Sequence, residues 1–295
     1  MFKVYSNIIP SELIDKVVEE HEKFKYSKTS LFRAQGTNSF EFPKIDKFGN
    51  QLNSIQNPDI LGFSRSFRKS IIEIIFHRKI SDSLSDFTGS KKHVQYQSMF
   101  FDHSTGTKLH QDTWYLDTKE RGRLVGAWIA LEDIYASSGP FCIYRGADKQ
   151  VLNDEDYDFD NLDEDLSFKT DYPEANRYDF IAKKGDVLIW DSFSIHGSLE
   201  PPSTNITRKS ITAHFYPFGL PVRDQIVSRA YSIYQHDKPI RTTNPRIYKA
   251  ATVNPYVYSF LCLFLYIFKP ISKFLMRDIL MRKKSKNRLE IRRIK

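Results

Sequence analysis

The feature that most constrains the fold is a run of short β-like segments between residues 93 and 217. HVQYQSMFF, RLVGAWIAL and GPFCIYRG are apolar stretches bounded by turn residues, and GDVLIWDSFSIHGS and RKSITAHFYPF predict two further strands. Helical patterns of 10–15 residues are absent between them, which disfavours a parallel sheet with crossover helices. The sequence therefore predicts an antiparallel sandwich or barrel.

Helical periodicity is concentrated before this run of strands. PSELIDKVVEEHEKF, with Ser11 as its expected N-cap, and SFRKSIIEIIFHRKI both place apolar residues at helical spacing. We expect a mostly helical N-terminal flank over residues 1–92, packed on a β core over 93–220, and a C-terminal extension over 221–295. The predicted fold class is mainly β with flanking α-helices.

Composition favours a globular protein of a reducing compartment. Hydrophobic residues make up 40% of the chain and charged residues 27%, as in ordinary globular proteins. Cys142 and Cys262 are too few and too far apart for a disulfide framework or a cysteine metal cluster. The N-terminal segment MFKVYSNIIPSELIDKV shows no secretory signal. We therefore expect a cytoplasmic protein.

The net charge of +8 is concentrated near the end of the chain. Residues 269–295 contain 11 Lys and Arg against two acidic residues, whereas the remainder has 33 basic and 34 acidic residues. Residues 1–268 are nearly neutral and contain no recognisable DNA- or RNA-binding motif, which argues against nucleic-acid binding. An insertion over 153–166 has the opposite bias, with eight acidic residues between Asp154 and Asp165. It is either a solvated loop or a flap that contacts the site or the basic tail.

The tail over residues 256–295 combines an apolar and a basic part. YVYSFLCLFLYIF is 13 residues long, with Ser259 as its clearly polar member, and is short of the roughly 20 residues that span a bilayer. The following ISKFLMRDILMRKKSKNR places apolar and basic residues on different sides of a predicted helix. Either the tail lies on anionic lipid as an interfacial helix, or it packs on the β core. In the first case the protein is peripheral at the inner membrane surface.

Metal-ligand residues stand close together in TKLHQDTWYLDT, where His110 and Asp112 form an H-x-D motif. Such a motif is common by chance, but alternate residues of a strand point to one side and can reach one ion. Two imidazoles and one carboxylate suit Fe(II) and leave positions open. His196 is the natural third ligand, because it ends an apolar segment and precedes Gly197, which permits close backbone approach. Arg208 can bind a carboxylate through two hydrogen bonds.

Four ordered blocks resemble the phytanoyl-CoA dioxygenase (PhyH-like) family of Fe(II)/2-oxoglutarate-dependent oxygenases. They are KLHQDTWYLD, GRLVGAWIALEDIYASSGPFCIYRGADK, GDVLIWDSFSIHGS and RKSITAHFYP, and together they cover roughly residues 93–217. The resemblance implies a double-stranded β-helix of the jelly-roll or cupin-like kind. The segment YRGADK departs from the family's usual turn, so no role is carried over to Arg145–Lys149.

Site residues follow from the resemblance position by position. It implies iron ligation by His110, Asp112 and His196, and a contact between Arg208 and the distal carboxylate of 2-oxoglutarate. The resemblance also implies that Trp128 and Ser198 contact the co-substrate and that Gln97 contacts co-substrate or substrate. Simpler structural roles are the alternatives. Trp128 would otherwise be core, and Ser198 would otherwise cap a turn. Of the remaining histidines, His214 is the one expected near the pocket.

The resemblance implies an enzyme that uses Fe(II), 2-oxoglutarate and O₂ to hydroxylate a C–H bond, giving succinate and CO₂. The carboxylate of Asp112 favours hydroxylation, because halogenating relatives lack this ligand. Two alternatives stay open: a non-catalytic ligand-binding scaffold, and a metal-dependent hydrolase that uses Zn²⁺ on the same residues. The expected partner is a small-molecule, lipid or glycolipid substrate, while the sequence indicates no oligomeric state.

Overall fold

A computed structural model describes residues 1–268 of the 295, apart from 38, 115, 146–175, 202–204 and 223–238. The predicted acidic insertion, most of the YRGADK turn and the basic part of the tail lie outside the described residues.

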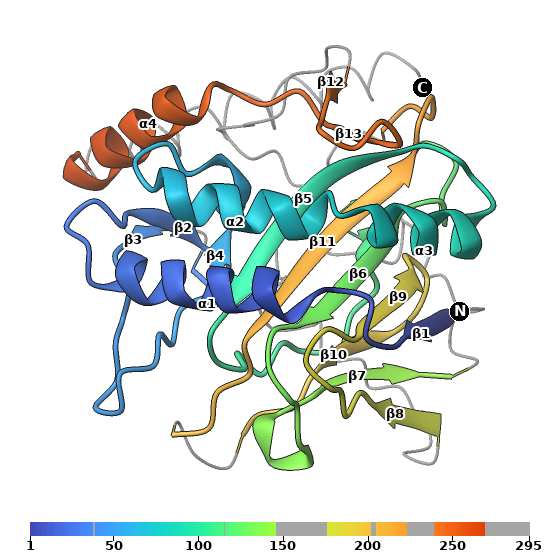
Figure 1. Cartoon of the computed structure of the whole chain (residues 1–295), viewed down its shortest axis with the longest axis horizontal. Helices are drawn as coiled ribbons and strands as arrows, with labels where there is room; N and C mark the ends of the chain where they lie inside the picture. The colour runs from blue at the N-terminus through green and yellow to red at the C-terminus, as the bar shows by residue number, and fades with distance from the viewer. Residues whose placement is uncertain (38, 115, 146–175, 202–204, 223–238, 269–295) are drawn as a thin grey trace, which may run out of the picture.

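The β core consists of a large sheet facing a small one (Figure 1). The large sheet has the order β1-β9-β6-β11-β5-β4-β2-β3 and its strands pair antiparallel, except that β13 runs parallel to β5 and also pairs with β12. The small sheet has the order β10-β7-β8. This arrangement is the expected double-stranded β-helix.

The strands are β1 (Phe2–Tyr5), β2 (Phe32–Ala34), β3 (Phe40–Glu41), β4 (Ile55–Gln56), β5 (His93–Phe101), β6 (Val125–Ala130), β7 (Phe141–Tyr144), β8 (Arg177–Asp179), β9 (Val187–Asp191), β10 (His196–Ser198), β11 (Ser210–Pro217), β12 (Ile240–Arg241) and β13 (Ile247–Lys249). The 3₁₀ helices are η1 (Pro58–Ile60), η2 (Asp112–Trp114) and η3 (Ala136–Ser138).

Alternation along the strands directs side chains into different apolar clusters on the two faces of the large sheet. In β6, Val125, Ala127 and Ile129 pack in the cluster that includes the helices, while Trp128 and Ala130 pack in the cluster shared with the small sheet. Strand β9 alternates in the same way, and β11 contributes Ile211, Ala213 and Phe215 to the first of these clusters. The large sheet is therefore buried on both faces, and its second face carries side chains toward the small sheet.

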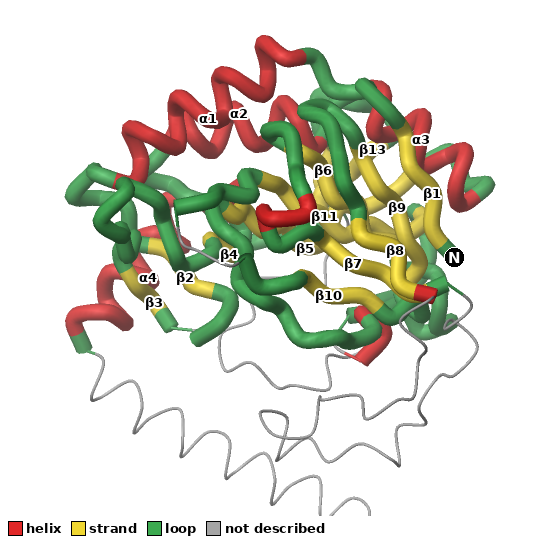
Figure 2. The backbone as a smooth tube through the Cα atoms, turned by 90° about the horizontal axis from the view of Figure 1, so that it is seen from below, coloured by secondary structure: helices red, strands yellow, loops and turns green. Residues whose placement is uncertain are grey.

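Three helices cover the outer face of the large sheet: α1 (Ser11–Lys25), α2 (Arg65–Ile75) and α3 (Arg78–Thr88) (Figure 2). The predicted N-cap at Ser11 was wrong, because Pro10 occupies that position and Ser11 begins the helix. The predicted second helical stretch is divided at Phe76 and His77. His77 Nδ1 accepts a hydrogen bond from the backbone of Lys79 at 3.4 Å, which starts α3 as a separate helix.

The segment GDVLIWDSFSIHGS also divides into two elements. Its apolar part forms β9 in the large sheet, whereas His196 begins β10 in the small sheet and does not end the same strand. Asp191 causes the break, because its Oδ1 accepts hydrogen bonds from the backbones of Phe193 (3.2 Å) and Ser194 (2.9 Å). This turn carries the chain from one sheet to the other.

The C-terminal extension is tied to the core through β13 and through α4 (Pro255–Ile267), which lies beside β2 and β3 (Figure 1). One side of α4 is buried, through Tyr258, Ser259, Cys262 and Leu265. The Ser259 hydroxyl accepts the backbone N–H of Gly62 at 2.8 Å. Among the described residues, every helix is too short or too polar to cross a membrane.

We predict that replacing Lys249 with Met will destabilise the fold strongly. Lys249 Nζ lies 2.5 Å from the buried Oδ2 of Asp59, so the substitution leaves a carboxylate without its counter-charge. The expected loss in the free energy of unfolding is about 3–5 kcal/mol, measured by urea denaturation. Lys3→Met is the matched control, because the Lys3–Asp86 pair is half exposed and should change stability by less than about 1 kcal/mol. Equal losses in both variants would contradict the prediction.

Candidate metal centre

The two candidate histidine ligands are held by a reciprocal backbone bridge. The N–H of His110 donates to the carbonyl of His196 at 2.9 Å, and the N–H of His196 donates to the carbonyl of His110 at 3.0 Å. Gly197 lets these segments approach, because a Cβ at this position would lie 2.6 Å from the backbone oxygen of Thr107. The sequence prediction for Gly197 is confirmed.

The local structure of the H-x-D motif differs from the prediction. His110 lies in an isolated bridge and Asp112 begins the 3₁₀ helix η2, so the motif is not part of a regular strand. The turn is fixed by backbone hydrogen bonds from Thr113 to Ser192 (3.1 Å) and from Leu116 to Asp112 (2.8 Å). The side chains of His110 and Asp112 therefore converge through a turn and not through strand alternation.

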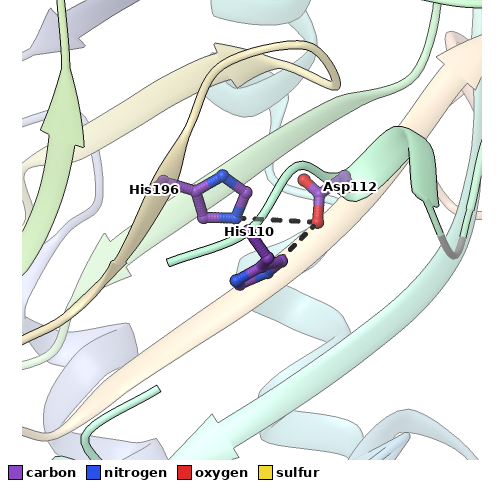
Figure 3. Close-up of side chains that lie close together, drawn as sticks. All are labelled: His110, Asp112 and His196. Carbon is purple, nitrogen blue, oxygen red and sulfur yellow. Dashed lines mark ion pairs between the residues drawn. The ribbon is translucent and has the colours of Figure 1, made fainter. Parts of the chain in front are cut away.

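The three predicted ligand side chains point toward one another (Figure 3). One donor atom from each of His110, Asp112 and His196 lies within 4.8 Å of the others. Asp112 Oδ1 is 3.8 Å from His110 Nε2 and 3.6 Å from His196 Nε2. These separations leave room for a cation among the three atoms.

Both imidazoles are oriented by backbone carbonyls. His110 Nδ1 lies 2.8 Å from the carbonyl oxygen of Lys108, and His196 Nδ1 lies 2.9 Å from that of Ser194. A carbonyl can only accept, so each Nδ1 carries the hydrogen. In the neutral ring this leaves a lone pair on Nε2, the atom that faces Asp112 in both cases. The histidines therefore present the tautomer that a metal ion requires.

The charges at the centre also suit a cation. Burial lowers the pKa of His196 to about 3, so the ring is neutral at physiological pH. Burial alone would raise the pKa of Asp112, but the neighbouring imidazoles of His214, His196 and His110 hold it below its usual value. Asp112 Oδ2 also accepts the indole N–H of Trp190 at 2.9 Å. The centre therefore places an ionised carboxylate beside the neutral ring of His196.

Arg208 lies just before β11 with its side chain buried, only 2% of the residue being exposed. Within the described part of the chain, neither Nε nor Nη1 has a hydrogen-bond partner. Burial lowers the pKa of Arg208 to about 10, which still leaves the guanidinium charged near neutral pH. A buried cation with unused donors is costly unless an anion completes it, so this site fits a carboxylate ligand.

An aromatic layer connects Arg208 with the histidines. The guanidinium carbon of Arg208 lies 5.8 Å from the ring of Trp128 and 5.4 Å from that of Phe101. Phe141 lies 6.2 Å from Trp128 and stacks on His196 at 5.4 Å between ring centroids. Trp128 is thus both a core residue and a neighbour of the proposed carboxylate site.

Ser198 and Gln97 have different surroundings. The hydroxyl of Ser198 accepts the backbone N–H of Thr107 at 2.8 Å, so it holds the segment before His110 in place. Gln97 is buried on β5 opposite His214 of β11, beside a β-bulge. Contacts of either residue to a co-substrate stay predictions.

Two residues near the centre carried little signal in the sequence. For Trp190, the alternation along the segment VLIWD predicts on which face of the sheet the side chain lies. It does not predict the hydrogen bond to Asp112. His214 was expected near the pocket, and its Nε2 lies 3.3 Å from Asp112 Oδ2. Neither contact could be found without knowing the register of the strands.

The family model for phytanoyl-CoA dioxygenase (PhyH) matches residues 57–210, just over half of the chain. The chain belongs to the PhyH family. Curated relatives include the peroxisomal phytanoyl-CoA dioxygenases of Bos taurus, 32% identical over 110 residues, and of Homo sapiens, 31% identical over 110 residues. In both cases the match covers 36% of this chain and 32% of the relative, so the chain spans about a third of these relatives' length.

Solved structures support the double-stranded β-helix of this PhyH-family member. The α-ketoglutarate-dependent carbocyclase SnoK from nogalamycin biosynthesis matches with a TM-score of 0.54 and 14% identity, over 77% of this chain and 83% of its own. EctD from S. alaskensis, solved with 2-oxoglutarate and 5-hydroxyectoine, matches with a TM-score of 0.56 and 14% identity, over 84% and 83%. At this identity the likeness shows the fold.

Acidification should destabilise the metal-free protein. Burial lowers the pKa of His196 to about 3 and those of His21 and His93 to about 4, below the value of about 6.5 in an unfolded chain. As the pH falls through about 6.5, the unfolded chain gains protons that the folded protein excludes, so the free energy of unfolding falls.

His196→Gln should remove one of these protons and flatten the pH dependence. The expected change in slope is roughly one proton, or about 1.4 kcal/mol per pH unit below the unfolded pKa. Urea denaturation of metal-free wild type and variant from about pH 7 to about pH 5 measures it. Parallel curves for the two proteins would show that His196 is not held neutral.

Proposed function

We propose that the protein is an Fe(II)/2-oxoglutarate-dependent dioxygenase that hydroxylates a C–H bond of a small-molecule or lipid-like substrate, with succinate and CO₂ as co-products. The observation that carries the proposal is the convergence of His110, Asp112 and His196, with donor atoms within 4.8 Å. Two imidazoles and one carboxylate are the ligand set of non-haem Fe(II) oxygenases. Bound iron would supply the activation of O₂ that this reaction needs.

Arg208 is proposed to hold the distal carboxylate of 2-oxoglutarate. Its buried Nε and Nη1 lack partners in the described chain, and a carboxylate can accept from both at once. The buried, aromatic surroundings strengthen this contact, because water does not compete for the charge. Trp128 would form one wall of the co-substrate site, while Gln97 would contact co-substrate or substrate. Ser198 would act by holding the segment before His110.

The proposed substrate class is drawn from structural neighbours and curated relatives. SnoN, an α-ketoglutarate-dependent epimerase with a TM-score of 0.56 and 12% identity over 84% of this chain and 92% of its own, is a further structural neighbour. It was also solved with Fe³⁺, α-ketoglutarate and nogalamycin RO, a small molecule. The curated relatives are named for phytanoyl-CoA, which joins a lipid chain to a polar carrier. A small molecule or an amphiphile is therefore the proposed substrate.

We predict that the purified protein will form succinate from 2-oxoglutarate only when Fe(II) is present. Uncoupled turnover makes this measurable before the substrate is known. Arg208→Gln should raise the KM for 2-oxoglutarate by about 30-fold or more, because it removes the partner of a buried charge, and should leave Fe(II) affinity unchanged. His110→Ala should lose Fe(II) binding and succinate formation together. Quantified succinate and Fe(II) titrations provide both readouts.

The same assay separates the alternatives. A Zn²⁺-dependent hydrolase would be active with Zn²⁺ and without 2-oxoglutarate, and a ligand-binding scaffold would bind 2-oxoglutarate without turnover. Absence of succinate with Fe(II), in the presence of candidate amphiphiles and small molecules, would contradict the proposed activity.

We further propose that α4 and the basic residues 269–295 bring the protein to an anionic lipid surface. The outward side of α4 exposes large apolar side chains, including Phe260 (61% exposed), Ile267 (59%) and Phe264 (55%). Exposure of so many apolar groups on one helix is costly unless another apolar phase covers them. The following 27 residues carry a net charge of +9, which suits anionic headgroups. Such a location would favour an amphiphilic substrate.

We predict that the double variant Phe260→Glu and Phe264→Glu will lose co-sedimentation with vesicles of phosphatidylcholine and phosphatidylglycerol. Phe48→Glu is the matched control, since Phe48 is 51% exposed and lies outside α4. Deleting residues 269–295 should remove the salt-sensitive part of the binding. Wild-type binding by the double variant would contradict a lipid-binding α4. If the double variant keeps vesicle binding but loses self-association, the exposed side of α4 is instead an interface with a second copy of this chain.

A further inference from the structure

The two oxygens of Asp112 have different surroundings. Oδ1 faces Nε2 of His110 at 3.8 Å and Nε2 of His196 at 3.6 Å. Oδ2 points to the opposite side, where it accepts the indole N–H of Trp190 at 2.9 Å and lies 3.3 Å from Nε2 of His214. All of these groups are buried except for part of His110. Only Oδ1 is directed at the space between the histidines.

The strand register places the partners of Oδ2. His214 of β11 pairs with Gly126 of β6, and Gly126 pairs with Trp190 of β9, so the three residues form a row across the large sheet. Gly126 leaves space for the indole, because a Cβ at this position would lie 2.2 Å from Cζ2 of Trp190. The indole is thus packed in place by the sheet.

His214 completes the row from the other side. Its ring is buried, and neither nitrogen has a hydrogen-bond partner among the described residues. The acidic atom beside this ring is Oδ2 of Asp112, which lies 3.3 Å from Nε2 of His214. The hydrogen bond from Trp190 and the polar ring of His214 beside the same oxygen are surroundings that orient a metal-ligating carboxylate and tune its affinity for the metal.

A carboxylate can bind a metal ion through one oxygen or through both. Two histidines and one carboxylate oxygen leave three of six positions on an octahedral ion, whereas a second carboxylate oxygen would leave two. A chelating 2-oxo acid needs two positions, and O₂ needs another. Releasing Oδ2 for the ion would also leave the buried indole N–H of Trp190 unsatisfied, which is costly.

We propose that Trp190 and His214 are positioning residues that restrict Asp112 to Oδ1 as its metal-binding atom. This inference rests on the proposed function, since it concerns the same centre. Losing either partner frees Oδ2 and changes both the affinity for a metal and the number of positions left open.

The test is a Co²⁺ titration of the metal-free full-length protein. Calorimetry measures the affinity, and the visible absorption of bound Co²⁺ reports its coordination. Trp190→Phe keeps a ring but removes the N–H, and His214→Leu removes the polar ring. Each should weaken Co²⁺ binding about 10- to 100-fold and alter the spectrum. His214→Gln, which retains a polar N–H group, should recover most of the affinity. Thermal unfolding confirms that each variant is folded.

Phe180→Leu is the control for general loosening of the core. Phe180 is buried in the same apolar cluster as Trp190 and is not part of the Asp112 contacts, so its truncation should lower the Tm without changing Co²⁺ affinity. Wild-type affinity and spectrum in both Trp190→Phe and His214→Leu would overturn this inference alone. Failure of the wild-type protein to bind Co²⁺ would overturn the proposed function as well.

Discussion

The structure depends on one reciprocal backbone contact, in which His110 and His196 exchange N–H···O hydrogen bonds of 2.9 and 3.0 Å. These residues are 86 positions apart in the sequence, and the bridge joins the small sheet to the segment that precedes η2. It fixes two imidazoles side by side, and the following turn brings Asp112 to their Nε2 atoms. Gly197 permits the approach, because a side chain at that position would meet the backbone of Thr107.

Polar groups at the centre follow one pattern: each makes a structural contact through one atom and directs another atom toward the site. The Nδ1 atoms of His110 and His196 lie beside backbone carbonyls, and their Nε2 atoms face Asp112 Oδ1. Asp112 accepts from Trp190 through Oδ2 and faces the histidines through Oδ1. Arg208 keeps two donors unpaired within the described chain. Burying such groups is costly, and binding a cation and a dicarboxylate would recover that cost.

Sequence reasoning predicted the fold class because strand-length apolar segments without intervening helices leave few architectures. Ordered motif blocks indicated His110, Asp112 and His196 as partners, and Gly197 as a close-approach position. The turn at Asp112 and the helix break at His77 were missed, because both depend on hydrogen bonds that no periodicity encodes. The role of Trp190 was also missed, since it requires the strand register.

The central claim is that His110, Asp112, His196 and Arg208 together form one Fe(II) and 2-oxoglutarate site. Its most direct test is an anaerobic titration of the Fe(II)-loaded protein with 2-oxoglutarate, followed by the visible charge-transfer absorption that arises when a 2-oxo acid chelates the iron. Our account predicts a saturable band that is absent in Asp112→Ala and needs much more 2-oxoglutarate in Arg208→Gln. A protein that binds Fe(II) yet gives no band at any 2-oxoglutarate concentration would contradict the claim.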